Sequence, residues 1–289
     1  MCNGKDIPFW HRLPLTRFKL FIARVIYLLL RLMMVSNIQH IRCRGIHYEV
    51  DLTEGIDLSL FLFGNFQRYI TANNYFSVPD KAIVIDIGAN IGSMTMNFAR
   101  MVPEGRVYAF EPTHYAYEKL QRNISLNPEL AERIQAMQLF VSDRPGPVHN
   151  IKAYSSWKVD GSARQTHPLH GGMIRNAEGV SAITLDDFCI GNQISRVDLI
   201  KIDTDGHELQ VLTGARKTLG KYTPLLIFEI GLYTLNAHNI GFEQYFNYLK
   251  SFEYTLINSK NGNAITLDNY RRQIPLRSTT DILAIPIKR

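Results

Sequence analysis

The feature that most constrains the fold is a regular alternation, from Ala82 onward, of short apolar runs with segments of helical periodicity. The apolar runs cover residues 82–88, 106–112, 134–143, 197–203, 224–230, 254–258 and 281–288. Strands that alternate with helices predict a parallel sheet, because a parallel neighbour can be reached only through a crossover, which is almost always right-handed. The sequence therefore predicts an α/β fold with a doubly wound, mainly parallel seven-stranded sheet.

Three segments depart from this alternation. Residues 1–47 form a basic arm with one helical pattern, and residues 48–79 have the pattern of a strand and a helix that lead into the main domain. Residues 144–183 are rich in glycine, proline, serine and histidine, and a loop of this length usually is functional or contains an added hairpin. The predicted organisation is a helical arm (1–47) and one domain (48–289) with an irregular insertion at 144–183.

The positive charge is confined to the arm. The chain has a formal net charge of +6, yet residues 1–47 alone hold eight Lys or Arg against one acidic residue, and the remainder is close to neutral. A basic groove on the main domain is therefore not predicted, and nucleic acid is excluded as a partner. We expect a small-molecule or glycan substrate instead.

The helical pattern of the arm, Arg17–Val35, is apolar but is interrupted by arginines. The uncharged stretch Val25–Leu30 is too short to span a bilayer, and no small-residue cleavage site of a signal peptide follows Arg31. Arginines seven residues apart predict a basic stripe on an otherwise apolar helix. Two alternatives follow: the helix packs on the main domain or on a second subunit in a dimer, or it lies in a membrane surface.

The three cysteines have no paired spacing, so the sequence predicts neither a disulfide framework nor a zinc site. A reducing compartment is the simpler expectation. We predict a cytoplasmic protein, with membrane association through the arm as the alternative.

The run VIDIGANIG, Val84–Gly92, is typical of a strand that ends in a glycine turn and opens a helix. Gly88 and Gly92 allow the main chain to approach a ligand closely, and Asn90 tolerates positive φ. Asp86 lies two residues before the first glycine, where a carboxylate would repel a pyrophosphate but would suit a cationic ligand.

Acidic or polar residues also lie at the ends of the next two apolar runs. Glu111 ends the second run, where it is placed to accept hydrogen bonds from a ribose diol. Ser142 and Asp143 end the third run, where an adenine amino group would need an acceptor. Because ligands bind at the carboxyl ends of strands in open α/β sheets, these residues predict a nucleoside-containing cofactor.

In order along the chain, the blocks DLTEGIDLSLFLFGNF, VIDIGANIG, VYAFEP, NISLN, TLDDF and LIKIDTDGHELQVLTGA resemble those of the FkbM-type family of class I methyltransferases. The resemblance covers about residues 48–258 and implies a Rossmann-like sheet that binds S-adenosylmethionine. It implies O-methylation of a hydroxyl on a sugar, glycolipid or secondary metabolite. At two positions the chain departs from the family, which often has glutamate at Asp205 and a large apolar residue at His207. Cofactor contacts are implied at Asp86, Gly88, Asn90, Gly92, Glu111 and Asp143.

In this architecture the fourth strand ends beside the methyl group. Asp203 is therefore predicted to orient or deprotonate the acceptor hydroxyl, with Glu229 at the end of the fifth strand as its neighbour. His207 is the competing base. Lys201 is expected to point to the other face of the sheet or to pair with an acid, with binding of an anion as a further alternative. A carboxylate pair could also hold a divalent ion, but the sequence supplies no third ligand, so no metal residues are predicted.

Two other classes of function use the same fold. A nicotinamide-dependent oxidoreductase would also place a nucleotide at a glycine turn, and a non-catalytic binding module would retain the sheet without turnover. Equilibrium binding of the two cofactors separates the first alternative from methyl transfer, and substitution of Asp203 tests the second.

Overall fold

The computed structural model describes residues 16–64, 67–147, 152–160, 172–177, 179–237, 240–275 and 278–287. The chain divides into two compact units. The first comprises residues 1–69 and 154–174, and the second comprises residues 70–153 and 175–289.

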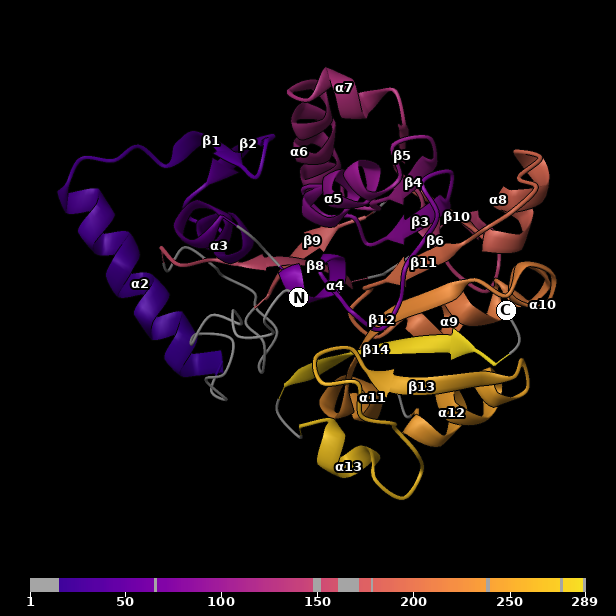
Figure 1. The fold of residues 1–289 in the computed structure, drawn as a ribbon. Helices are drawn as coiled ribbons and strands as arrows, with labels where there is room; N and C mark the ends of the chain where they lie inside the picture. The colour runs from indigo at the N-terminus through magenta and orange to yellow at the C-terminus, as the bar shows by residue number, and fades with distance from the viewer. Residues whose placement is uncertain are drawn as a thin grey trace. The chain divides into compact units, whose positions relative to one another are not determined.

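The second unit is built on a seven-stranded sheet with the order β13-β14-β12-β11-β3-β4-β5 (Figure 1). Strand β14 is antiparallel to both of its neighbours, and the pairs on the other side of β12 are parallel. The strands are β3 (Ile83–Ile87), β4 (Arg106–Phe110), β5 (Ile134–Met137), β11 (Leu199–Ile202), β12 (Leu225–Gly231), β13 (Tyr254–Asn258) and β14 (Thr279–Pro286). The prediction of a doubly wound, mainly parallel seven-stranded sheet is confirmed, and the strand order reverses between β3 and β11, where such sheets bind ligands.

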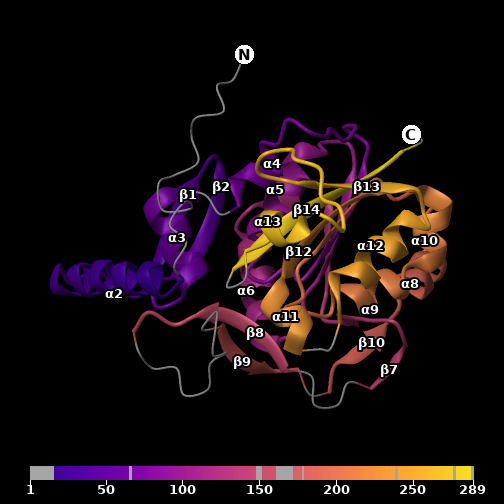
Figure 2. The same ribbon diagram turned by 90° about the horizontal axis from the view of Figure 1, so that it is seen from below.

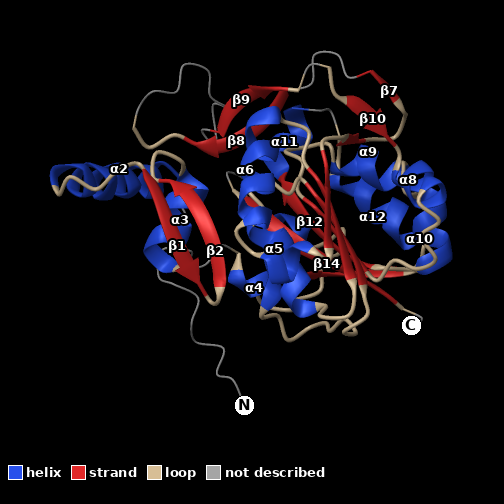
Figure 3. Ribbon diagram, turned by 90° about the horizontal axis from the view of Figure 1, so that it is seen from above, coloured by secondary structure: helices blue, strands red, loops and turns tan. Residues whose placement is uncertain are grey.

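Helices cover both faces of this sheet. Figures 2 and 3 show α5 and α6 on one face, and α8, α9, α10 and α12 on the other. These helices are α5 (Ser93–Met101), α6 (His114–Ser125), α8 (Leu185–Gly191), α9 (Glu208–Thr213), α10 (Arg216–Tyr222) and α12 (Phe242–Lys250). Further helices are α7 (Pro128–Ala131), α11 (Leu232–Ala237) and α13 (Tyr270–Gln273).

Alternation along the strands decides which face each side chain reaches. Ile85 and Ile200 pack in the apolar core together with Val211 of α9 and Tyr245 of α12. Because successive strand residues point to opposite faces, the residues next to these isoleucines point to the face covered by α5 and α6. The polar residues Asp86 and Lys201 therefore share that face.

The third predicted strand is interrupted. The apolar run 134–143 forms β5, which ends at Met137, and then β6 (Phe140–Val141), which pairs with β10 (Ser181–Ile183) in a separate sheet that includes β7 (Gly146–Pro147). The prediction that Ser142 and Asp143 end the third strand of the central sheet is therefore wrong. A continuous apolar run does not reveal that its second half pairs with a different strand.

The first unit contains α2 (Thr16–Leu32), a hairpin of β1 (Ile38–Cys43) and β2 (Ile46–Asp51), and α3 (Gly55–Phe63). The hairpin crosses the predicted boundary after residue 47. The short helix α4 (Arg68–Thr71) follows, and β8 (Lys152–Trp157) pairs with β9 (Gly172–Asn176) in the insertion. Across the described residues, every helix is too short or too polar to cross a bilayer.

Within the first unit, Lys158 joins the insertion to the segment before α3. Its Nζ lies 2.9 Å from Glu54 Oε1 and 3.6 Å from Asp51 Oδ2, and it donates to Thr53 Oγ1 at 2.7 Å. Both Lys158 and Glu54 are largely buried, so removing either would leave the other charge poorly solvated. The polar residues of the DLTEGID block thus stabilise this unit.

Candidate active site

The registers of three parallel strands bring the predicted reactive residues together. Asp86 on β3 is the register partner of Lys201 on β11, which in turn is opposite Ile227 on β12. Two residues further along, on the same face and at the carboxyl ends of these strands, β11 is followed by Asp203 and β12 carries Glu229. The positively charged side chain of Lys201 therefore lies on the same face of the sheet as Asp203 and Glu229, two residues before the strand ends that carry these acids.

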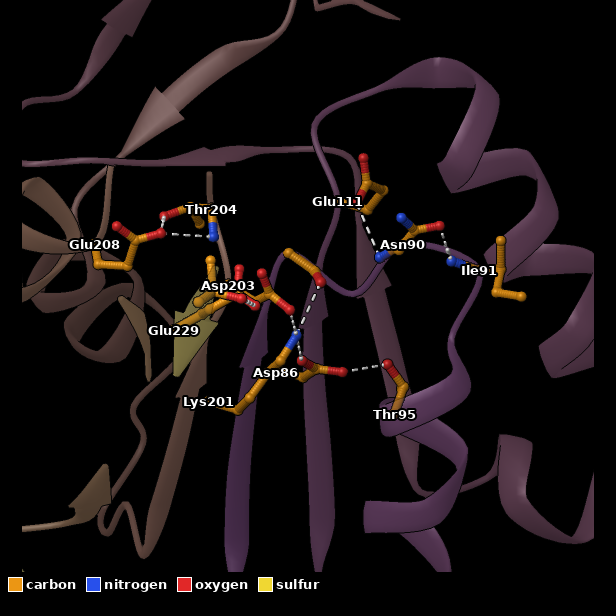
Figure 4. A network of polar contacts seen from close by, with 12 residues as sticks. Asp86, Asn90, Ile91, Thr95, Glu111, Lys201, Asp203, Thr204, Glu208 and Glu229 are labelled. Atoms are coloured by element: carbon orange, nitrogen blue, oxygen red, sulfur yellow. Dashed lines mark hydrogen bonds and ion pairs between the residues drawn. The ribbon is translucent and has the colours of Figure 1, made fainter. Parts of the chain in front are cut away.

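Lys201 is the centre of this arrangement (Figure 4). Its Nζ lies 3.5 Å from Asp86 Oδ1 and 3.3 Å from Asp203 Oδ2, and it donates to the carbonyl oxygen of Gly88 at 3.1 Å. Burial opposes the charge on Lys201, but the carboxylates of Asp203 and Asp86 outweigh it and raise the pKa of the ammonium well above its usual range. Lys201 therefore pairs with acids, which is one of the alternatives that the sequence left open.

The cation that Asp86 faces is Lys201. The Asp86 side chain is fully buried, and its Oδ2 accepts a hydrogen bond from Thr95 Oγ1 of α5 at 2.6 Å. The Asp86 side chain thus has no exposed surface for the direct cofactor contact that the sequence predicted.

The glycine turn directly contacts the chain that follows β11. Gly88, Asn90 and Gly92 all have positive φ, of 78°, 50° and 88°. A Cβ on Gly88 would overlap the carbonyl oxygen of Asp203, so only glycine allows the two strand ends to approach this closely. This contact explains the position of the glycine two residues after Asp86.

We expect Gly88→Ala to destabilise the protein by about 2 to 3 kcal/mol, because the left-handed conformation and the lost contact with Asp203 both carry a cost. Gly191→Ala is the matched control, since its φ is not left-handed and no described atom lies within 4 Å of the added Cβ. Urea unfolding of both variants gives the difference. Equal midpoints for the two variants would contradict the close approach.

Glu111 lies at the other side of the glycine turn. Its Oε2 accepts from the main-chain N–H of Asn90 at 2.9 Å, and its Oε1 accepts from the N–H and hydroxyl of Thr113 at 2.9 and 2.6 Å. Burial raises the pKa of Glu111, and these hydrogen bonds only partly oppose the effect. Glu111 therefore fixes the turn, and Lys201 is near enough to contribute to its electrostatic environment. The Gly88 side of the turn faces Asp203.

The turn between β11 and α9 holds two further acids. Glu208 is buried and its Oε1 accepts from Thr204 N, Thr204 Oγ1 and Gly206 N at 3.0 to 3.2 Å, so it closes the turn. Asp205 has a φ of 53°, a conformation that aspartate adopts more readily than most residues. Burial, followed by the charges of Asp203 and Glu208, raises the pKa of Asp205 well above its usual range.

Glu229 is the predicted neighbour of Asp203, and the structure adds two residues that the sequence did not identify. Asp281 of β14 is the register partner of Glu229, and Tyr233 follows β12 in α11. Burial raises the pKa of the Tyr233 phenol, with Glu229 and Asp205 as the next causes, so its ring lies in the field of these acids. Neither residue belongs to a local motif, so no sequence signal could have found them.

Glu229 is also expected to make stability depend on pH. Burial, then Asp203 and Asp281, raises the pKa of Glu229 well above its usual range, although Thr279 Oγ1 donates to its Oε1 at 2.6 Å. The folded state then binds more protons than the unfolded state above the ordinary carboxyl pKa of about 4.3, so stability is lost as pH rises through the raised pKa.

Glu229→Gln is therefore expected to raise the melting temperature by about 2 to 4 °C near pH 8, which corresponds to roughly 1 kcal/mol. It should change nothing below about pH 4, where the native glutamate is neutral as well. Thermal unfolding at both pH values measures this, with Glu104→Gln, which is 59% exposed, as the control. An equal gain at both values would refute the electrostatic cause.

Three further predicted site residues make contacts of other kinds. The His207 ring, at the N-terminus of α9, packs edge-to-face on Phe140 of β6, with 5.4 Å between the centroids. Ser142 and Asp143 follow β6, where Ser142 Oγ donates to Asp143 Oδ1 at 3.2 Å. Over the described ranges, no group of three or more His, Cys, Asp and Glu side chains has an arrangement suited to a metal ion.

The strand order, the antiparallel β14 beside β12 and the glycine turn after β3 define the class I methyltransferase fold. The family model for the methyltransferase FkbM domain matches residues 86–256, more than half of the chain. The chain belongs to the FkbM methyltransferase family.

Two named relatives illustrate the match. The chain is 29% identical over 184 residues to the 2-O-methyltransferase NoeI of Sinorhizobium fredii, covering 61% of this chain and 73% of NoeI. It is 32% identical over 159 residues to the 31-O-demethyl-FK506 methyltransferase FkbM of Streptomyces tacrolimicus, covering 46% of this chain and 58% of the relative. The chain thus spans between half and three quarters of the length of these relatives.

Among solved structures, the methyltransferase FkbM of Methylobacillus flagellatus is 18% identical, with a TM-score of 0.48. The match covers 75% of this chain and 47% of that one.

Proposed function

We propose that the protein transfers a methyl group from S-adenosylmethionine to a hydroxyl of a sugar-containing acceptor or a secondary metabolite. The observation that carries this proposal is the Lys201 junction, which ties the glycine turn at Gly88 to the carboxylate of Asp203. The names of the relatives support it, since NoeI is a 2-O-methyltransferase and AglP of Haloferax volcanii is a hexuronic acid methyltransferase.

The residues around the glycine turn suit this cofactor. The main chain could approach the cofactor closely at the three residues with positive φ, Gly88, Asn90 and Gly92. Glu111 would accept hydrogen bonds from the ribose hydroxyls of the cofactor. The hydroxyl of Ser93, at the first residue of α5, is buried and has no hydrogen-bond partner among the described residues. When bound, S-adenosylmethionine supplies a methyl group on a positively charged sulfur, which an acidic edge favours.

Asp203 would act on the acceptor. Its side chain is 25% exposed, so it can receive the proton of an acceptor hydroxyl as the oxygen forms its bond to the methyl carbon. Lys201 orients the Asp203 carboxylate. Glu229 would accept a hydrogen bond from a second hydroxyl group of the methyl acceptor. Most of the barrier reduction would come from holding the acceptor in line, up to roughly 7 to 11 kcal/mol.

Calorimetric titration with S-adenosylhomocysteine tests the cofactor, with NAD as the competitor. We expect saturable binding of the first and none of the second at the same concentrations. Tighter binding of NAD would favour the oxidoreductase alternative and overturn the proposal. Transfer of a labelled methyl group to a panel of sugar and polyketide acceptors then tests the acceptor class.

A further inference from the structure

Helix α2 presents a wide apolar face to solvent, which we call the exposed α2 face. Phe21, Leu28, Leu29 and Leu32 are each more than half exposed, and Val25 is 40% exposed. At 3.6 residues per turn these five positions lie within an arc of about 100° on the helix. Folded proteins rarely leave such a contiguous apolar surface uncovered.

The other side of α2 is the side held within the first unit. Tyr27 is 8% exposed, and its hydroxyl donates to Asn37 Oδ1 at 3.1 Å. On the helix, Tyr27 lies outside the arc of the exposed α2 face. Packing within the unit therefore uses a different side of the helix and leaves the exposed α2 face available to a partner.

The charge beside this face selects the partner. Arg24 and Arg31 are exposed and, seven residues apart, lie along one border of the exposed α2 face. Between Asp6 and Glu49 the sequence contains no acidic residue. A second copy of the same face would bring like charges together, whereas anionic lipid headgroups would neutralise the arginines while the acyl region receives the leucines.

We propose that the exposed α2 face binds the surface of an anionic membrane, with the helix lying in the plane of the interface. Exposed apolar area and adjacent arginines contribute independently to such binding. This binding would involve only the first unit and would not require methyl transfer.

Sedimentation of the full chain with vesicles tests this. We expect the protein to pellet with vesicles of phosphatidylglycerol and phosphatidylcholine, less with phosphatidylcholine alone, and less at high salt. The triple variant Leu28→Glu/Leu29→Glu/Leu32→Glu should bind at least about tenfold more weakly, because the inserted carboxylates are repelled by the anionic surface. The double variant Arg24→Gln/Arg31→Gln should lose most of the salt-sensitive part of the binding to anionic vesicles.

Ile190→Glu is the matched control, since Ile190 is a 63% exposed apolar residue of α8 in the second unit, and it should pellet like the unaltered protein. Leu29→Trp, with Trp10 and Trp157 replaced by phenylalanine, keeps the face apolar, and a blue shift of its emission on adding vesicles provides a measurement independent of the folding of the triple variant. Absence of pelleting by the full chain would overturn the proposal. So would a dimer in solution that the triple variant dissociates while vesicles have no effect.

Discussion

Asp203→Asn is expected to lower kcat by about 10² to 10⁴-fold while leaving the affinity for S-adenosylhomocysteine largely unchanged. Asparagine keeps the size of the side chain, but it cannot receive a proton and it gives Lys201 no charged partner at the 3.3 Å position. Single-turnover transfer of a labelled methyl group, together with calorimetry, separates the loss of chemistry from a loss of binding.

Asp187→Asn is the matched control for this experiment. Asp187 is an exposed aspartate in the first turn of α8, and its replacement should leave turnover unchanged. Turnover of Asp203→Asn at the unaltered rate would show that Asp203 neither orients nor deprotonates the acceptor. Turnover by His207→Ala at a severely reduced rate would instead favour the competing base.

Lys201→Met is expected to affect both stability and catalysis. Removing the ammonium leaves the buried carboxylate of Asp86 without its counter-ion, at a cost of about 3 to 5 kcal/mol. In the double variant Asp86→Asn/Lys201→Met the unpaired charge is gone, so stability should return while kcat stays low. Urea unfolding and kcat measured on the same variants test both parts.

Comparison of kcat with stability distinguishes a positioning role of Lys201 from a merely structural one. Without the ammonium, the Asp203 carboxylate loses its ion pair at 3.3 Å, so kcat should stay low in the double variant even though stability returns. Lys81→Met is the control, since Lys81 is 72% exposed and its pair with Glu104 at 3.4 Å contributes little. Recovery of both stability and kcat in the double variant would exclude a positioning role.

Local pattern determined much of the fold and part of the site. The alternation of strands and helices predicted the sheet, and the turn after β3 was predicted from its glycines. Thr184 caps α8 by accepting from Asp187 N at 3.0 Å, and Pro128 is the first residue of α7. These features depend on a few neighbouring residues, because caps, turns and strand periodicity are local.

Which strands lie side by side was decided only by the tertiary structure. β11 lies against β3, so Asp86 and Lys201 become register partners although they are far apart in the chain. The return of β14 beside β12 places Asp281 opposite Glu229. Pairing between distant strands depends on how all the apolar faces are buried together, and no window of sequence contains that information.

The same reason accounts for the predictions that were wrong. The third strand of the central sheet ends at Met137, because Phe140 and Val141 pair with β10 instead. The prediction that Ser142 and Asp143 end a strand of the central sheet was wrong for this reason. Asp86 was expected to suit a cationic ligand, whereas in the folded chain it pairs with Lys201, which the sequence alone could not show. The sequence by itself determined the residue types at the strand ends, and the packed sheet decided which of them meet, because contact between distant segments is a property of the folded chain.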